Sequence, residues 1–420
     1  MNVRRLWRKG VTAGGAVAVQ FTLAGGSLVV QAVAARLLGA DGYGTYALLY
    51  GVLVLVIGVQ TSWVGDALTV FDRFEPRVRG ALLLSLLLTC GGGALAAALV
   101  AVWLLPAGAV AVFTLLTVLW VLNETGRRVF TARMEFWRLA ANDAAGYAVT
   151  LGVLGGCLLA GVEASLGLVF GAMCAGAAFA VVLARLRQPR EEYALAPLRG
   201  SAVREVLGFS GWRAAQAGIR PLALLAARSL IAVTAGRAAL GAVEAARLLL
   251  APAQTVANGA GWFFLGDFAR AQRSGRPLPA SAAVKASLTL GGITGAIALV
   301  CVALAGPLGP VLTGGAFALE TAALAGWALY AVVFAGTLPL SSLATARKES
   351  RLVFVIRGVE MALGLAVLGA LLLADPGAAA AAPYCLSAGG VASAVVLWFL
   401  LRRADPAPAP AKADGAVTAA

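Results

Sequence analysis

The feature that most constrains this sequence is a pair of long runs without a charged residue, joined by a short glycine-rich segment. The runs extend from Val11 to Ala34 and from Tyr46 to Val64, and the junction reads ARLLGADGYGTYALL. A helix needs about 20 apolar residues to cross a bilayer, so each run predicts one membrane-spanning helix. Because glycine tolerates positive φ, Gly39, Gly42 and Gly44 predict a tight turn between the two helices.

The composition extends this pattern to the whole chain. Hydrophobic residues make up 61% of the 420 residues and charged residues only 12%, whereas a soluble domain carries about 25% charged residues. We therefore expect an all-α polytopic membrane protein of about twelve transmembrane helices. The expected spans are residues 12–35, 44–70, 81–104, 109–124, 141–161, 164–184, 206–233, 239–264, 284–305, 317–342, 352–373 and 383–401.

Lysine and arginine alternate sharply between the loops of this topology. The loops on one side carry nearly all of them, among these Arg127, Arg128, Arg133 and Arg138, while the other side has only Arg36 and Arg237. By the positive-inside rule, both termini are predicted to be cytoplasmic, in a multi-pass protein of the inner or plasma membrane. The net charge of +14 is explained by this topology and by contact with anionic lipids, so we expect membrane lipids as partners and no nucleic acid.

Several chemistries are disfavoured by the residues themselves. The sequence contains no histidine, which removes imidazole as a proton relay, metal ligand or catalytic base. The five cysteines lie in apolar runs without metal-like spacing, which indicates small buried side chains rather than a disulfide framework. They are Cys90, Cys157, Cys174, Cys301 and Cys385. We expect no metal site and no cofactor.

The chain divides into two halves of six spans. We expect an N-terminal bundle over 1–185, a cytoplasmic linker loop over 186–205 with Pro189 and Pro197, and a C-terminal bundle over 206–404. The tail 405–420 is rich in proline and alanine and is predicted to be disordered. An offset of 197 residues aligns Gly39 with Gly236, Gly44 with Gly241, Phe71 with Phe268 and Arg73 with Arg270. Six spans per half predict a parallel repeat about an axis along the membrane normal.

The opening of the chain resembles a known family. A basic lead (RRLWRKG), a glycine-bearing helix, the ARLLGADGYGTYALL turn and a basic loop containing FDRFEPRVRG are similar to the polysaccharide transporter branch of the multidrug/oligosaccharidyl-lipid/polysaccharide (MOP) exporter superfamily, the O-antigen-type flippases. This resemblance implies two six-helix bundles in a MATE-like V shape, alternating access and a polyprenyl-pyrophosphate-linked oligosaccharide as cargo. It also implies polysaccharide polymerase or assembly proteins as candidate partners.

Span 206–233 carries the residues that most need a function. Arg213, Gln216, Arg220 and Arg228 fall on one stripe of this helix at 100° per residue. Charges in a bilayer are expensive, so the stripe must face protein or water. One interpretation is a cationic cavity that binds the pyrophosphate of the cargo; the other is that Arg213 and Arg228 reach the two headgroup layers and only Arg220 is deep. In the resembling family, arginines of this span and of the opening hairpin line the lumen, which adds Arg36 as a substrate-binding candidate.

Two acidic residues are candidates for ion coupling. Glu360 lies three residues after Arg357, so we favour an ion pair along one helix face. Glu244 and Arg247 repeat that spacing. Asp66 has no basic residue within one turn of its own helix and either joins a cation site or meets an arginine of span 206–233.

The function best supported by the sequence is a flippase for a lipid-linked oligosaccharide, and not an enzyme. The main alternative is a cation-coupled multidrug or metabolite antiporter of the same superfamily, which would need acidic residues facing the lumen. Lesser alternatives are a lipid II type flippase, whose resembling members usually carry two further spans, and a membrane polysaccharide polymerase, which would need a soluble loop or a catalytic carboxylate pair. A structural scaffold would leave the arginine stripe unexplained.

Overall fold

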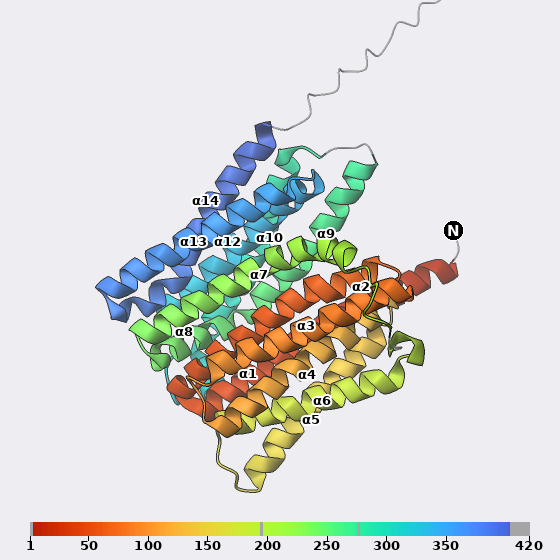
Figure 1. The fold of residues 1–420 in the computed structure, drawn as a ribbon. Helices are drawn as coiled ribbons and strands as arrows, with labels where there is room; N and C mark the ends of the chain where they lie inside the picture. The colour runs from red at the N-terminus through yellow and green to blue at the C-terminus, as the bar shows by residue number, and fades with distance from the viewer. Residues whose placement is uncertain (1–2, 194–195, 275–277, 404–420) are drawn as a thin grey trace, which may run out of the picture.

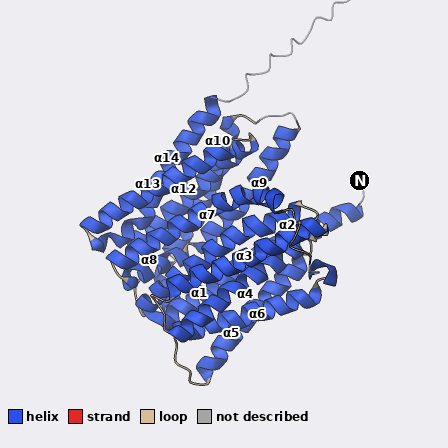
Figure 2. Ribbon diagram, viewed as in Figure 1, coloured by secondary structure: helices blue, strands red, loops and turns tan. Residues whose placement is uncertain are grey.

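A computed structural model describes residues 3–193, 196–274 and 278–403, and the described residues form helices joined by short loops, with no strand among them (Figures 1 and 2). Nine helical segments of this part of the chain are long and apolar enough to cross a membrane. The first, Gly14–Val70, contains a reversal and supplies two crossings. The broken pair 237–273 and the helix 136–159 occupy the two remaining predicted spans, which confirms the twelve-span, all-α architecture.

The helices follow the predicted order. The first half comprises α1 (Val3–Gln60), the π-helical turn η1 (Thr61–Gly65), α2 (Asp66–Val70), α3 (Pro76–Ala101), α4 (Ala107–Ala132), α5 (Phe136–Leu159) and α6 (Leu166–Arg187). The short helix η2 (Arg190–Tyr193) lies in the linker. The second half comprises α7 (Val203–Thr234), α8 (Arg237–Leu249), α9 (Ala251–Arg273), α10 (Ala280–Ala303), α11 (Ala305–Thr313), α12 (Thr321–Ala346), α13 (Ser350–Ala374), η3 (Pro376–Ala381) and α14 (Ala382–Arg403). The predicted tail, 405–420, lies outside the described residues.

The two halves form two bundles of roughly parallel helices. In Figure 1, α1 to α6 gather in one half of the molecule and α8 to α14 in the other, with α7 running between them. We call these sets the N-bundle and the C-bundle, and we count α7 with the C-bundle because it begins the second half of the chain.

The predicted glycine turn is confirmed at one residue and corrected at two. Only Gly39 leaves the helical region, with φ of 64°, whereas Gly42 and Gly44 are helical. The chain doubles back there, since the hydroxyls of Ser27 and Tyr50 lie 3.0 Å apart although 23 residues separate them. The reversal between α7 and α8 uses Gly236, with φ of 93°, at the position predicted by the 197-residue offset.

A second and clearer sequence repeat relates a turn in the first half of the chain to a turn in the second half. The sequence TARME at 131–135 recurs as TARKE at 345–349, joining α4 to α5 and α12 to α13. Among the described residues, Met134 and Lys348 within these turns are the two non-glycine residues with positive φ. Backbone hydrogen bonds match as well, because Glu135 N donates to Phe130 O as Glu349 N donates to Ala344 O. The number of residues that separates these two turns is larger than the 197 residues that separate the Gly39 and Gly236 turns. Part of the difference is α11, which lies between α10 and α12 and has no counterpart in the first half.

The bundles meet along a seam between the second half of α1, continued by η1 and α2, and α7. The two segments run antiparallel, because residues with higher numbers in the first segment contact residues with lower numbers in α7. The pairs are Gly51 with Arg228, Gly58 with Pro221, Asp66 with Arg213 and Phe71 with Phe209. Gly44, Gly51 and Gly58 recur every seven residues, two helical turns, so they place a flat strip of backbone against the C-bundle.

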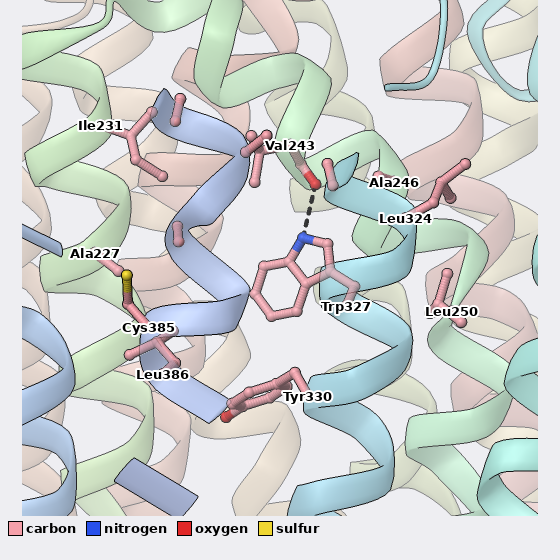
Figure 3. Close-up of a cluster of buried hydrophobic side chains, with 14 of the residues drawn as sticks. Ala227, Ile231, Val243, Ala246, Leu250, Leu324, Trp327, Tyr330, Cys385 and Leu386 are labelled. Atoms are coloured by element: carbon pink, nitrogen blue, oxygen red, sulfur yellow. Dashed lines mark hydrogen bonds between the residues drawn. The ribbon is translucent and has the colours of Figure 1, made fainter. Parts of the chain in front are cut away.

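The core of the C-bundle is apolar with one directed polar contact. Trp327 of α12 lies among Leu324, Tyr330 and Leu386, and its indole Nε1 donates a 2.9 Å hydrogen bond to the carbonyl of Val243 in α8 (Figure 3). That bond satisfies the indole N–H inside an otherwise apolar cluster and fixes α12 against α8. The predicted role of the cysteines fits this packing, because Cys301 and Cys385 are buried and all five are free thiols.

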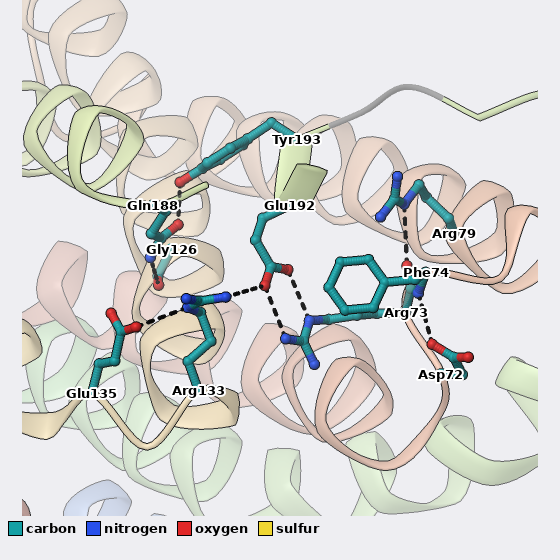
Figure 4. A network of polar contacts seen from close by, with 10 residues as sticks. All are labelled: Asp72, Arg73, Phe74, Arg79, Gly126, Arg133, Glu135, Gln188, Glu192 and Tyr193. Carbon is teal, nitrogen blue, oxygen red and sulfur yellow. Dashed lines mark hydrogen bonds and ion pairs between the residues drawn. The ribbon is translucent and has the colours of Figure 1, made fainter. Parts of the chain in front are cut away.

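The linker between the bundles is ordered where it is described and is fastened to the N-bundle. Glu192 of η2 pairs with Arg73 at 2.8 Å and with Arg133 at 3.4 Å, and Arg133 also pairs with Glu135 at 3.0 Å (Figure 4). Burial raises the pKa of Glu192, but the hydrogen bonds and charges of Arg73 and Arg133 outweigh it and hold that pKa below its usual value. The neighbouring Tyr193 hydroxyl contacts Gln188, and burial raises the pKa of Tyr193 to about 12.

Candidate functional site

Arg220 occupies the middle of α7 and faces the C-bundle. Its Nε donates to the hydroxyl of Tyr330 at 3.0 Å, and its Nη1 lies 3.4 Å from Oδ1 of Asn258. The guanidinium carbon stands 3.5 Å from the ring centroid of Phe334, which is a cation–π contact. Among the described residues, Arg220 makes no ion pair. The following residue, Pro221, has no N–H, so it leaves the carbonyl of Ala217 without its usual helical donor.

The other residues of the predicted stripe have protein partners. Arg213 pairs with Asp66 across the seam at 2.7 Å, and the side chain of Gln216 donates to the carbonyl of Ser350 at 3.1 Å. The meeting of Asp66 with an arginine of α7, one of the two expectations for Asp66, is therefore confirmed.

Arg228 is placed differently from both sequence-based interpretations. Its guanidinium is buried and binds both carboxylate oxygens of Glu244, at 2.9 and 3.0 Å. Glu244 also pairs with Arg247 at 2.7 Å, as the spacing predicted. The expectation that Arg228 reaches the headgroup layer is wrong, because a carboxylate on α8 holds it inside the protein. One carboxylate balances two guanidiniums, so this cluster keeps one net positive charge.

The two remaining candidates are separate from this region. Arg36 is exposed beside the Gly39 turn and packs against Gly314, after α11. Glu360 is buried and pairs with Arg357 at 3.4 Å, which confirms the favoured ion pair. Arg357 also donates to the hydroxyls of Thr337 and Ser341 on α12.

The structure contains a cavity of about 560 Å³ between the bundles, mostly within the N-bundle. Helices α1, α4, α5 and α6 supply most of its wall, and Pro221, Thr255 and Asn258 supply the C-bundle side. Its volume falls within the ~300–1,000 Å³ of small-molecule pockets. A smaller cavity of about 280 Å³ lies between α9 and α12 and shares Asn258 with the larger one. Asn258, the partner of Arg220, therefore lines both cavities, whereas Arg213, Arg220 and Arg228 line neither of these two.

The polar wall of the larger cavity is a cluster that sequence reasoning missed. Arg127 stands between two carboxylates, 3.0 Å from Glu124 and 3.1 Å from Asp143. Arg128 pairs with Glu124 at 2.7 Å. The prediction that Arg127 and Arg128 lie in a loop is wrong, because α4 continues to Ala132 instead of ending near residue 124. The i,i+3 and i,i+4 spacing of Glu124 to these arginines was the available signal.

Comparisons with known proteins bear on the fold. No family model and no curated protein matches the sequence. An inward-facing multidrug resistance MATE family transporter of the MOP superfamily is similar in structure, with a TM-score of 0.64 at 12% identity over 92% of this chain and 94% of that chain. A MATE protein in the straight conformation gives 0.62 at 14% identity, over 94% and 95%.

A third similar structure is a MOP superfamily transporter from Pyrococcus furiosus, described as having a binding pocket of reverse polarity that suggests a different function. It has a TM-score of 0.62 at 14% identity, over 93% of this chain and 95% of that chain. All three matches extend over nearly the full length of both chains. This multi-pass membrane protein therefore has the fold of the MATE transporters of the MOP superfamily, with twelve membrane spans in two bundles of six.

Proposed function

We propose that this protein is a transporter that flips a polyprenyl-pyrophosphate-linked oligosaccharide from the cytoplasmic to the outer leaflet of the cell membrane. Alternating access of the two bundles exposes the central cavity to each side in turn, and both termini are cytoplasmic. In this proposal residues 1–185 and 206–404 are the moving units, 186–205 is the linker, and polysaccharide polymerase or assembly proteins receive the cargo.

The observation that carries the proposal is the charge of Arg220. It stands beside Asn258, a residue that lines both cavities, and no carboxylate among the described residues neutralises it; Arg220 itself lines neither cavity. Arg228 and Arg247 add a further positive charge that Glu244 does not balance. An anionic group gains most from such a region, and the planar guanidinium suits phosphate oxygens. A cation would be repelled there.

A second candidate function is cation-coupled export of drugs or metabolites. It is favoured by the two carboxylates, Glu124 and Asp143, that line the larger cavity, and by the multidrug transporter among the similar structures. Both carboxylates are already paired with arginines, which lowers their attraction for a further cation. We therefore favour the anionic cargo.

The test is translocation of a fluorescent polyprenyl-pyrophosphate oligosaccharide in proteoliposomes. Wild type should move the lipid, and Arg220→Ala should lower the rate by more than tenfold because the phosphate-binding charge is lost. Arg204→Ala is the matched control, since it removes the same charge from an exposed position in the first turn of α7. If wild type moves no lipid but exports an organic cation on a proton or sodium gradient, the second function replaces the first.

A further inference from the structure

Two residues in the wall of the larger cavity carry hydrogen-bonding atoms that are not used. Asn123 Oδ1 and Asp143 Oδ2 are buried and have no hydrogen-bond partner among the described residues, whereas Arg127 Nε faces Asp143 Oδ1 at 3.1 Å in an ion pair. All three residues line the cavity, and the Asp143 side chain is only 3% exposed. A buried polar atom without a partner has lost its hydration without gaining a replacement bond, so a ligand that supplies the missing bonds is favoured.

The charges around these atoms favour a neutral ligand. Glu124 and Asp143 supply two negative charges, and Arg127 and Arg128 supply two positive charges, within one connected set of ion pairs. Neither an added cation nor an added anion meets an opposite net charge there. The two unpaired atoms are both acceptors, and a hydroxyl group can donate a hydrogen bond to each of them.

The rest of the wall suits a ring with an apolar face. Tyr50, Trp120 and Tyr147 line the same cavity, and Tyr50 meets Trp120 edge to face at 5.8 Å between ring centroids. Aromatic side chains offer a flat apolar surface beside polar groups. A pyranose ring presents C–H groups on its faces and hydroxyls around its edge, and so matches both parts of the wall.

We propose that the N-bundle cavity is a binding subsite for a neutral saccharide, with Asn123 and Asp143 holding its hydroxyls and Trp120 packing against its ring. The role of this subsite in transport rests on the proposed function, in which Arg220 holds the pyrophosphate of the same cargo. The two positions are neighbours, because Asn258 lines the cavity and its Oδ1 lies 3.4 Å from Nη1 of Arg220. The sugar and the phosphate are thus recognised by different bundles.

The binding test uses the full-length protein in nanodiscs and a panel of neutral methyl glycosides of hexoses, deoxyhexoses and N-acetylhexosamines. Calorimetry or ligand-observed NMR should find at least one glycoside that binds saturably, whereas methylammonium and inorganic pyrophosphate do not compete with it. Asn123→Leu should raise its Kd at least tenfold, and Trp120→Ala should raise it as well. Thr114→Val is the matched control, because Thr114 also carries an unpaired buried polar atom on α4 but does not line the cavity.

Two results of the binding test would overturn the subsite. One is that no glycoside of the panel binds, which would leave the cavity to water alone. The other is that binding survives both Asn123→Leu and Trp120→Ala, which would place the sugar elsewhere.

The lipid translocation assay separates this proposal from the proposed function. If Arg220→Ala stops transport while Asn123→Leu changes neither the rate nor the preference among oligosaccharides, the flippase stands and the sugar subsite fails. If a glycoside binds the cavity as described but wild type moves no lipid-linked oligosaccharide, the proposed function fails and the saccharide subsite stands.

Discussion

At the scale of single residues, the arginines of α7 differ in their partners rather than in their spacing. Arg213 has Asp66, Arg228 has Glu244, and Arg220 has only neutral groups among the described residues. Helical geometry placed all three on one stripe, but it could not assign these partners, since Asp66, Glu244 and Tyr330 lie on other helices. Which of these arginines has a carboxylate partner therefore depends on the tertiary structure and cannot be deduced from their spacing.

The buried cluster of Arg228, Glu244 and Arg247 leads to a prediction about stability. Glu244→Gln leaves two guanidiniums in the protein interior without a carboxylate, and breaking such a buried pair costs about 3–5 kcal/mol. The free energy of unfolding in detergent should fall by that amount. The control is Asp41→Asn, whose partner Arg237 is 46% exposed, and which should cost under about 1 kcal/mol. Equal losses for the two variants would contradict the assignment.

Glu192 leads to a prediction about pH. Its folded pKa is lowered by Arg73 and Arg133, so its contribution to stability is complete above the pKa of an unfolded glutamate, about 4.3, and is lost as the pH falls through the folded value. Wild type should melt at a higher temperature than Glu192→Gln at pH 7. The gap should close progressively below about pH 4.3. A gap that stays constant down to pH 3 would show that the carboxylate charge is not the cause.

At the scale of elements, the seam shows why glycines recur in the second half of α1. A Cβ on Gly44 would overlap the carbonyl oxygen of Arg237, and one on Gly51 would press on the Arg228 guanidinium. The sequence predicted a helical hairpin here but assigned Gly42 and Gly44 to the turn. It could not distinguish a glycine that bends the chain, such as Gly39, from one that admits a neighbouring backbone, because both requirements select the same residue.

We predict that Gly44→Ala separates the two hairpins. The added methyl group meets backbone, which cannot rotate away, so the contact must open. Spin labels at positions 38 and 238, in a background without the five native cysteines, should report a longer distance in the variant. Gly25→Ala is the control, because Gly25 lies in the same helix with no neighbouring atom within 4 Å of the position of a Cβ. An unchanged distance would mean that the hairpins do not meet in the membrane.

At the scale of the whole molecule, the two bundles repeat the same helices with different charges. Asp143 is the eighth residue of α5 and contacts Arg127 of α4, whereas Arg357 is the eighth residue of α13 and contacts Ser341 of α12. The repeat of TARME at 131–135 as TARKE at 345–349 could have been found in the sequence. A comparison at the single offset of 197 residues, which aligns Gly39 with Gly236, does not reveal it. The position of Asp143 beside Arg127 could not be predicted. The span that precedes Arg127 was expected to end near residue 124, which left Arg127 in a loop, whereas α4 continues to Ala132.

Transport by relative movement of the bundles predicts that linking them stops it. Cysteines in place of Asp66 and Arg213, joined by a cleavable bis-maleimide, should abolish lipid translocation, and reductive cleavage of the linker should restore it. The control joins cysteines at Glu135 and Arg138, which belong to one bundle and lie one helical turn apart. Transport that continues in the cross-linked Asp66 and Arg213 variant would exclude alternating access at this seam.

The contact between the two hairpins is reciprocal, and this has a genetic consequence. A Cβ on Gly44 would overlap Arg237 O, and a Cβ on Gly241 would overlap Ala40 O, so both glycines belong to one contact, in which each helix admits the backbone of the other. Once either position has been enlarged, the contact is already open, and enlarging the second costs little more. The two positions should therefore show strong epistasis. Descendants of the chain that lose one glycine are released from selection to keep the other, so we expect the two glycines to be retained together or lost together.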